Sequence, residues 1–310
     1  MRLAFMGTAP FAIPSLRALV GAGHQVVGVF TQPDRPRGRG RKIHAPPIKV
    51  AALELALPVY QPDSIKTDSS RDCFELLSPE MIVVVAYGKI IPRWLIDLPP
   101  RGVVNVHGSL LPKYRGAAPV NWAIARGETI TGVCTMQIDE GLDTGPVYLC
   151  GETAIDPEET AVELASRLAG IGASLLTRTV DGIGAGTIRP KPQDHASATR
   201  APLMKKEDGV LDWSESAASI HNKVRAFTPW PSVSVRFRGQ SCKILRSRPS
   251  EEVGNKSCPG SIICDGERLN VVCGDGRLLG LLKLQMENRS ALGGSDFMNG
   301  MRVQAGEKFE

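Results

Sequence analysis

Asn105 and His107 stand two residues apart in a short β-branched segment, Val103 to His107, which ends at a Gly-Ser break. Apolar β-branched residues before such a break predict a buried strand that enters a loop. Residues two apart in a strand point to the same face, so an amide and a titratable imidazole would lie side by side. The carboxyl end of a strand is where ligands bind in open α/β sheets. A lone strand histidine is more often a satisfied core residue, so this pair needs further support.

A second segment, Asp139 to Gly145, supplies that support because it places Asp143 in a glycine-bounded turn. An amide, an imidazole and a carboxylate can together stabilise a developing oxyanion and move a proton. We find no convincing Ser-His-Asp or Cys-His motif for a nucleophile. Three acids so close together also fit a solvated turn, which is how we interpret Asp139 and Glu140.

Ordered matches along the whole chain resemble the folate-dependent formyltransferases. They are FMGTAPFAIPSL, VFTQPDRPRGRGRK, AYGKIIP, NVHGSLLPKYRGAAP, GLDTG, DGVLDWS and VRAFTPWPS. The resemblance implies an enzyme that transfers a formyl group from 10-formyltetrahydrofolate to initiator methionyl-tRNA. It also implies that the catalytic residues are Asn105, His107 and Asp143. Whether Asp143 orients the imidazole or accepts a proton through water stays open.

Gly108 departs from the alanine expected for the members that act on methionyl-tRNA. The motif HGSLLPKYRG is closer to the enzyme that formylates UDP-aminoarabinose, so a sugar-nucleotide amine is the alternative acceptor. A non-catalytic RNA-binding protein is a further alternative. The presence of all three candidate catalytic residues opposes it.

The segment Met81 to Ala86 is the most strand-like part of the chain and predicts a central strand. The loop that follows it would lie at the ligand-binding edge of the sheet. The resemblance implies that this loop and the loop after His107 bind the folate. The implied contact residues are Tyr87, Gly88, Ile90, Ser109, Leu110, Leu111 and Pro112. No metal and no nucleotide cofactor are expected.

Two basic stretches contain no acidic residue: Arg35 to Lys49 with six Lys or Arg, and His221 to Ser250 with seven. A solvated surface is the simplest interpretation of each. Two such stretches in different predicted domains fit a long polyanion that contacts both. The tRNA-binding candidates are Arg35, Arg37, Arg39, Arg41, Lys42, Lys223, Arg225, Arg236 and Arg238.

A chain of 310 residues predicts two domains. We expect an α/β fold in which a Rossmann-like, mostly parallel sheet domain (1–188) is followed by a linker (189–207). Residues 208–310 would form a small β-barrel, because five short strand-like segments lie between 233 and 284. The resemblance implies that this barrel is OB-like and binds tRNA. The net charge of +5 permits nucleic-acid binding without requiring it.

Glycines and prolines in the first basic stretch predict a loop without regular structure, followed by a helix at 51–57. The spacing of leucines predicts an amphipathic helix over 160–179. The seven cysteines are irregularly spaced and include no C-x-x-C, so we expect reduced thiols in a cytoplasmic protein. No apolar segment approaches the ~20 residues of a membrane helix, and we expect a monomer.

Overall fold

The computed structural model describes residues 1–37, 40, 42–254, 257–266, 268–304 and 306–310. Contacts divide the chain into two compact units. Unit 1 comprises Met1–Pro119, Thr131–Thr153 and Ala165–Pro202, and unit 2 comprises Val120–Ile130, Ala154–Leu164 and Leu203–Glu310. The domain boundaries at 188 and 208 stay a prediction.

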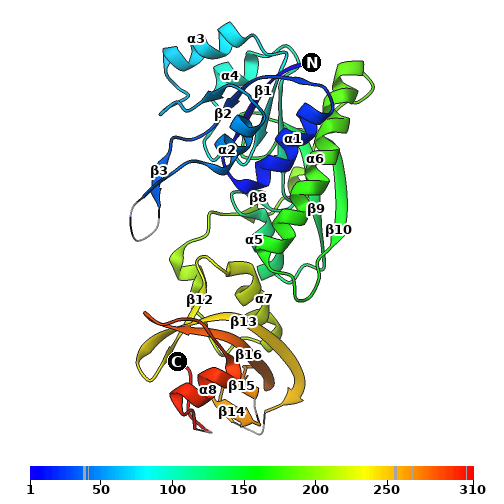
Figure 1. Cartoon of the computed structure of the whole chain (residues 1–310). Coiled ribbons are helices and arrows are strands. Elements are labelled where there is room, and N and C mark those ends of the chain that lie inside the picture. Colours follow the sequence, from blue (N-terminus) through cyan, green and yellow to red (C-terminus); the bar gives the residue numbers. More distant parts are fainter. Residues whose placement is uncertain (38–39, 41, 255–256, 267, 305) are drawn as a thin grey trace. The chain divides into compact units, whose positions relative to one another are not determined.

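A seven-stranded sheet forms the centre of unit 1 (Figure 1). Its order is β10 (Val147–Ala154), β9 (Ile130–Gln137), β7 (Val103–His107), β6 (Met81–Val85), β1 (Arg2–Gly7), β2 (Gln25–Phe30) and β5 (Val59–Tyr60). The five strands from β7 to β5 are parallel, and β9 is antiparallel to β7. All residues of β6 are buried, as a strand covered on both faces requires. The predicted mixed α/β fold with a mostly parallel sheet is confirmed.

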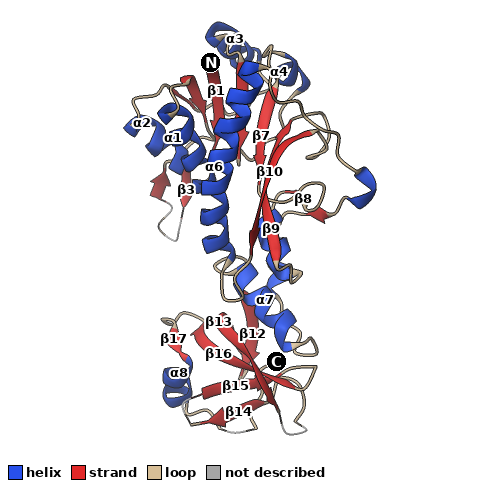
Figure 2. Ribbon diagram, turned by 90° about the vertical axis from the view of Figure 1, so that its right-hand side faces the viewer, coloured by secondary structure: helices blue, strands red, loops and turns tan. Residues whose placement is uncertain are grey.

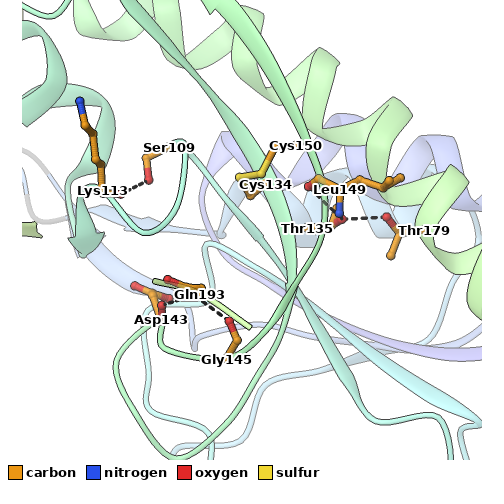
Figure 3. Close-up of a disulfide and its surroundings, with 10 residues drawn as sticks. All are labelled: Ser109, Lys113, Cys134, Thr135, Asp143, Gly145, Leu149, Cys150, Thr179 and Gln193. Atoms are coloured by element: carbon orange, nitrogen blue, oxygen red, sulfur yellow. Dashed lines mark hydrogen bonds between the residues drawn. A yellow bond between two sulfur atoms is a disulfide. The ribbon is translucent and has the colours of Figure 1, made fainter. Parts of the chain in front are cut away.

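Helices cover this sheet, and the longest runs along it (Figure 2). They are α1 (Ile13–Gly21), α2 (Pro47–Glu54), α3 (Asp68–Leu77), α4 (Arg93–Asp97) and α6 (Ala161–Ala185), with a 3-10 turn at Pro10–Ala12. In α6, Thr179 is hydrogen-bonded to Thr135 of β9 at 2.7 Å (Figure 3). A Cβ at Gly172 would lie 2.8 Å from Val106, so α6 packs closely on the face of β7 that is opposite to His107.

The first basic stretch contains a two-stranded ribbon, so the prediction of a loop without regular structure was wrong. Strands β3 (Arg35–Arg37) and β4 (Lys42–His44) pair antiparallel (Figure 1). Both strands of a two-stranded ribbon are edge strands, where a proline such as Pro36 is tolerated. The helix predicted at 51–57 begins earlier, at Pro47, because proline suits the first turn of a helix.

Unit 2 contains the predicted antiparallel strands. Strands β12 (Val233–Phe237), β13 (Gln240–Val253), β16 (Arg277–Met286), β15 (Arg268–Val272) and β14 (Ile262–Asp265) are neighbours in this order, and β17 (Leu292–Gly293) pairs with β16. The helices of unit 2 are α5 (Pro119–Ala125), α7 (Ala217–Phe227) and α8 (Gly294–Met301). A separate antiparallel sheet domain at the C-terminal end is thus confirmed.

The last residues of the chain pair with both ends of this sheet. The backbones of Glu310 and Arg236 exchange two hydrogen bonds, and Phe309 N–H donates to the carbonyl of Gly260. Phe309 is buried against Trp213 and Phe237. The closure of the sheet therefore depends on a C-terminal tail that showed no strand pattern.

Most of the predicted linker, 189–202, packs as part of unit 1, and its last residues, 203–207, belong to unit 2. Its residues form a 3-10 turn at His195–Ser197, strand β11 (Arg200–Ala201) and a second 3-10 turn at Lys206–Gly209. Strand β11 pairs with β8 (Arg115–Gly116), immediately after the loop that follows β7. Backbone pairing thus brings a segment without sequence periodicity next to the candidate site.

Cys134 and Cys150 form a disulfide between the neighbouring strands β9 and β10 (Figure 3), so the expectation of reduced thiols was wrong for this pair. The two Cα atoms lie 4.2 Å apart. The pairing was invisible because β10 itself was not predicted. The other five cysteines are free. Over the described ranges, none of the helices combines the length and apolarity needed to cross a membrane.

Candidate active site

His107 ends β7 and is buried, with one ring nitrogen facing a carbonyl and the other facing a carboxylate. Its Nε2 lies 2.9 Å from the carbonyl oxygen of Tyr114. Because a carbonyl only accepts, Nε2 holds a hydrogen and donates it. Nδ1 lies 3.7 Å from Oδ2 of Asp143. The proton that this ring can exchange is therefore the one on Nδ1, beside the carboxylate.

Asp143 lies in the turn that joins β9 to β10, with about a fifth of its side chain exposed. The backbone N–H of Gly116 donates to its Oδ2 at 2.9 Å. Asp143 itself adopts a positive φ of 52°. Aspartate tolerates this left-handed conformation better than most residues, which suits it to the turn. The turn between β9 and β10 thus brings the Asp143 carboxylate to the end of β7.

Tyr114 also has a positive φ, 59°, which a bulky residue rarely adopts. Its N–H donates to Oγ1 of Thr199 at 2.9 Å, and its carbonyl accepts from His107. The carbonyl of this strained residue is therefore held by the imidazole of His107, and its N–H is held by Thr199 in the segment after α6.

Asn105 lies on the same face of β7 as His107 and is partly exposed. Within the described part of the chain, no hydrogen bond involves its side-chain amide. The amide is thus free to donate to an oxygen atom placed at this end of the strand.

The loop after β7 folds tightly over the same edge. Ser109 is fully buried, and its hydroxyl donates to the carbonyl of Lys113 at 2.6 Å (Figure 3). Leu110 packs over β9, because a Cβ at Gly132 would lie 2.5 Å from its Cδ2. Leu111 and Pro112 are half-buried. The hydroxyl of Ser109 is committed within the loop, so the loop offers its backbone and apolar side chains.

The loop after β6 presents backbone in the same way. Tyr87 is buried, its carbonyl accepts from Thr8 and Gln32, and burial raises the pKa of its hydroxyl to about 12. Gly88 has a φ of 81°. Ile90 is 81% exposed.

Three of the basic candidates of unit 1, Arg35, Arg37 and Lys42, lie on the β3–β4 ribbon. Arg35 and Lys42 are exposed. Arg37 ends β3, opposite Lys42 in the pairing. Arg39 and Arg41 lie outside the described residues.

Three of the four basic candidates of unit 2 have partners within that unit. Lys223 is paired with Glu215, and Arg238 forks onto Glu307 at 2.7 and 2.9 Å. Arg225 is only 7% exposed and donates to the carbonyls of residues 156 and 159. Arg236, on β12, is exposed.

Three residues near the candidate site were not predicted: Tyr114 as the partner of His107, Thr199, and Gln193. Gln193 donates to the carbonyls of Asp143 and Gly145 (Figure 3). A glutamine within a polar stretch looks like part of a linker, so no sequence signal pointed to it. Among the described residues, no group of three or more His, Cys, Asp or Glu side chains could hold a metal ion.

Comparisons with known proteins agree over the whole chain. The formyl transferase family matches residues 1–180, and the formyl transferase C-terminal domain family matches residues 203–302. The methionyl-tRNA formyltransferase of Solibacter usitatus is 50% identical over 308 residues, which cover 99% of this chain and 98% of that protein. The methionyl-tRNA formyltransferase of Koribacter versatilis is 49% identical over 309 residues, with the same two coverages.

Among solved structures, an N-formyltransferase from Helicobacter canadensis superimposes with a TM-score of 0.70. The match covers 92% of this chain and 98% of that one, and the identity is 19%, so it supports the fold alone. The first family model spans more than half of the chain, and the relatives match it from end to end. The chain therefore belongs to the formyl transferase family.

Proposed function

We propose that this chain transfers the formyl group of 10-formyltetrahydrofolate to the free amino group of methionyl-initiator-tRNA. The product would be N-formylmethionyl-tRNA, which begins translation. The main support is the identity of 50% and 49%, over 99% of this chain, to two proteins named for this reaction. In this proposal, residues 1–188 form the catalytic domain, 189–207 the linker, and 208–310 the tRNA-binding domain.

One observation at the site supports formyl transfer in particular. His107 ends β7 and Asp143 lies in the turn between β9 and β10, yet Nδ1 and Oδ2 are only 3.7 Å apart. Asn105 is on the same face of β7 as His107. Formyl transfer needs a donor for the carbonyl oxygen and a route for one proton, and it needs no nucleophilic side chain. These three groups are sufficient for both tasks.

The edge around this trio suits a folate. Two loops there, after β6 and after β7, offer backbone groups, while apolar side chains such as Ile90 and Leu110 lie on them. A pterin ring requires a flat apolar wall with backbone donors and acceptors along its rim. We propose that Tyr87, Gly88, Ile90 and Ser109 to Pro112 hold the folate, which supplies the activated formyl group.

Each member of the trio then has a defined task. The Asn105 amide donates to the formyl oxygen as negative charge develops on it. The Nδ1 side of His107 exchanges the proton that must leave the incoming amine, while Nε2 stays bonded to the Tyr114 carbonyl. Asp143 stabilises the charged ring or receives the proton through water. The bond from the formyl carbon to the methionyl nitrogen forms first and gives a tetrahedral intermediate. The bond to the donor nitrogen then breaks as that nitrogen takes up a proton, so the proton lost by the incoming amine is balanced by the one gained by the leaving nitrogen.

The tRNA contacts that we propose lie on the exposed basic residues. In unit 1 these include Arg35 and Lys42, and in unit 2 the exposed candidate is Arg236. The proposal also extends to Arg37, Arg39 and Arg41 of the same basic stretch. Lys223, Arg225 and Arg238 are engaged by neighbouring groups, which weakens the case for direct contacts from them.

The test is an incubation of the purified protein with 10-formyltetrahydrofolate and either methionyl-initiator-tRNA or UDP-aminoarabinose. We expect formylation of the tRNA and none of the sugar nucleotide. Formylation of the sugar nucleotide alone would reject the proposed acceptor, and formylation of neither would reject the proposed reaction.

A further inference from the structure

Gln193 is 8% exposed and lies against the turn that contains Asp143 (Figure 3). Its amide nitrogen donates to the carbonyl oxygens of Asp143, at 2.9 Å, and of Gly145, at 2.7 Å. An amide nitrogen has two hydrogens, so both donors are used on this one turn.

The other end of the same side chain faces a cation. Oε1 of Gln193 accepts from Nε of Arg115 at 3.1 Å and from Nη2 at 2.7 Å. The orientation of the amide follows from these partners, because carbonyls only accept and a guanidinium only donates. A flipped amide would lose all four contacts.

The turn needs such external support. Asp143 has a positive φ of 52°, and Gly145 lies so close to β9 that a Cβ there would be 2.0 Å from the carbonyl oxygen of Gln137. Aspartate tolerates this conformation better than most non-glycine residues, but the left-handed region stays less favourable than the right-handed one, so the turn gains from neighbours that hold it. Gln193 holds the carbonyls on both sides of Thr144.

Arg115 connects Gln193 to the chain segment 114–116, which contacts both His107 and Asp143. The preceding residue, Tyr114, accepts the hydrogen bond from His107, and the following residue, Gly116, donates to Oδ2 of Asp143. Gln193 therefore links the segment that orients the imidazole with the turn that carries the carboxylate. The relative position of this segment and this turn therefore determines the 3.7 Å distance between Nδ1 of His107 and Oδ2 of Asp143.

We propose that Gln193 is a positioning residue for formyl transfer: its amide fixes the turn that holds Asp143 opposite His107. This inference rests on the proposed function of the trio. Gln193 does not touch the reacting atoms and acts through Asp143.

Two substitutions of Gln193 distinguish the role of its amide nitrogen, which binds the turn, from that of its oxygen, which binds Arg115. Gln193→Met removes every polar contact at similar length. Gln193→Glu keeps acceptors for Arg115 but faces oxygen toward two carbonyl oxygens, so it cannot hold the turn. Thr179→Val is the matched control, since it removes a buried hydrogen bond in unit 1 from the opposite face of the sheet.

We expect both Gln193 variants to lower kcat at least ~10-fold, because displacing a catalytic group by about 1 Å typically costs up to ~10²-fold. The KM for methionyl-tRNA should stay within about twofold, since binding groups elsewhere are untouched. Amide hydrogen exchange across 141–145 should become faster in both variants. Thr179→Val should retain kcat and the exchange rates of this turn.

Several results would overturn the proposal. One is a Gln193→Glu variant with the kcat of the wild type, since that would make the Arg115 contact the only important one. Another is unchanged exchange across 141–145 in Gln193→Met, or an equal loss of kcat in Thr179→Val. If Gln193→Met does not fold, Gln193→Asn, one methylene too short to hold the turn, is held to the same expectations. A wild type that formylates neither acceptor would reject the proposed function, and hydrogen exchange would still decide whether Gln193 holds the turn.

Discussion

His107 lies directly opposite Cys134 in the antiparallel pairing of β7 with β9. Opposed residues in such a pair point to the same face of the sheet, so the imidazole and one sulfur of the disulfide share that face. The disulfide joins β9 to β10, and the turn between these strands contains Asp143. The cross-link therefore braces the two strands that deliver the proposed carboxylate.

The disulfide predicts how many thiols react in the unfolded protein and how much the free energy of unfolding falls when the cross-link is removed. Cys134 and Cys150 are 16 residues apart, and closing a loop of this size restricts the unfolded chain by about 3 kcal/mol. We expect five reactive thiols in urea without reductant and seven after reduction. Cys150→Ser should lower the free energy of unfolding, measured in urea, by about 3 kcal/mol. Cys258→Ser, at an exposed free cysteine, is the control, and seven thiols without reductant would contradict the cross-link.

Substitutions in the trio predict losses of turnover. Losing one transition-state donor typically costs ~10²–10³ in rate, so Asn105→Ala, His107→Ala and Asp143→Ala should each lower kcat at least ~10²-fold. The affinity for tRNA should change little, because these groups contact the reacting atoms. Glu140→Gln is the control, since Glu140 lies in the same turn but is exposed and paired with Arg93. Near-normal kcat in a folded His107→Ala or Asp143→Ala variant would refute the assignment.

The β3–β4 ribbon predicts a salt-dependent contact with tRNA. Arg35 and Lys42 are exposed on it, and each phosphate neutralised adds roughly 0.7–0.9 to the slope of log affinity against log salt. The double variant Arg35→Ala, Lys42→Ala should therefore bind methionyl-tRNA more weakly and with a flatter slope. Lys66→Ala, at an exposed lysine outside both basic stretches, should keep the wild-type slope. An unchanged slope in the double variant would remove the ribbon from the tRNA site.

In unit 2, Arg236 and Arg238 form a matched pair on neighbouring exposed positions. The side chain of Arg238 is held by Glu307 and by two backbone carbonyls. The side chain of Arg236 is exposed and has no such partners among the described residues. Arg236→Ala should flatten the salt slope of tRNA binding by about one contact, roughly 0.7–0.9. Arg238→Ala should mainly lower the stability of unit 2, since it frees the C-terminal segment. The reverse pattern in salt-titrated binding and urea unfolding would contradict this division.

The stability of the protein should fall in mild acid because of His221. Burial lowers the pKa of this side chain, and the nearby Arg225 lowers it further, against the opposing effects of Pro157 and Glu158. Below about pH 6.5, His221 therefore takes up a proton more readily in the unfolded chain than in the folded protein, and this favours unfolding. The contribution of His221 is complete above that pH and is lost as the pH falls.

The measurement is urea unfolding at several pH values from about 7.5 to about 5.5, the range around the ordinary histidine pKa. His221→Gln should make the free energy of unfolding less dependent on pH than in the wild type. His24, whose pKa burial also lowers, contributes with the same sign and should remain in that variant. His44→Gln, at an exposed histidine, is the control. Equal pH dependence in wild type and His221→Gln would exclude this cause.

The strands at the centre of the sheet could be predicted from the sequence because they are mostly apolar segments, whereas the edge strand β10, which is half exposed, was missed. Met81–Val85 and Val103–His107 are buried on both faces, and burial on both faces requires such segments whatever their neighbours are. The period of two along β7 likewise placed Asn105 and His107 on one face. These features are local, so the residues themselves determine them.

The completed site depended on contacts between distant segments. Asp143 reaches His107 because β9 pairs with β7, and Gln193 reaches the Asp143 turn because the backbone of Lys191 pairs with Val147 and β11 pairs with β8. Backbone pairing leaves no side-chain pattern in a polar stretch of irregular structure, so the supporting residues could not be found from spacing. The disulfide between Cys134 and Cys150 and the closure of unit 2 by Phe309 have the same origin. The sequence by itself determined which groups we propose for the chemistry, and the tertiary structure decided which residues hold them in place.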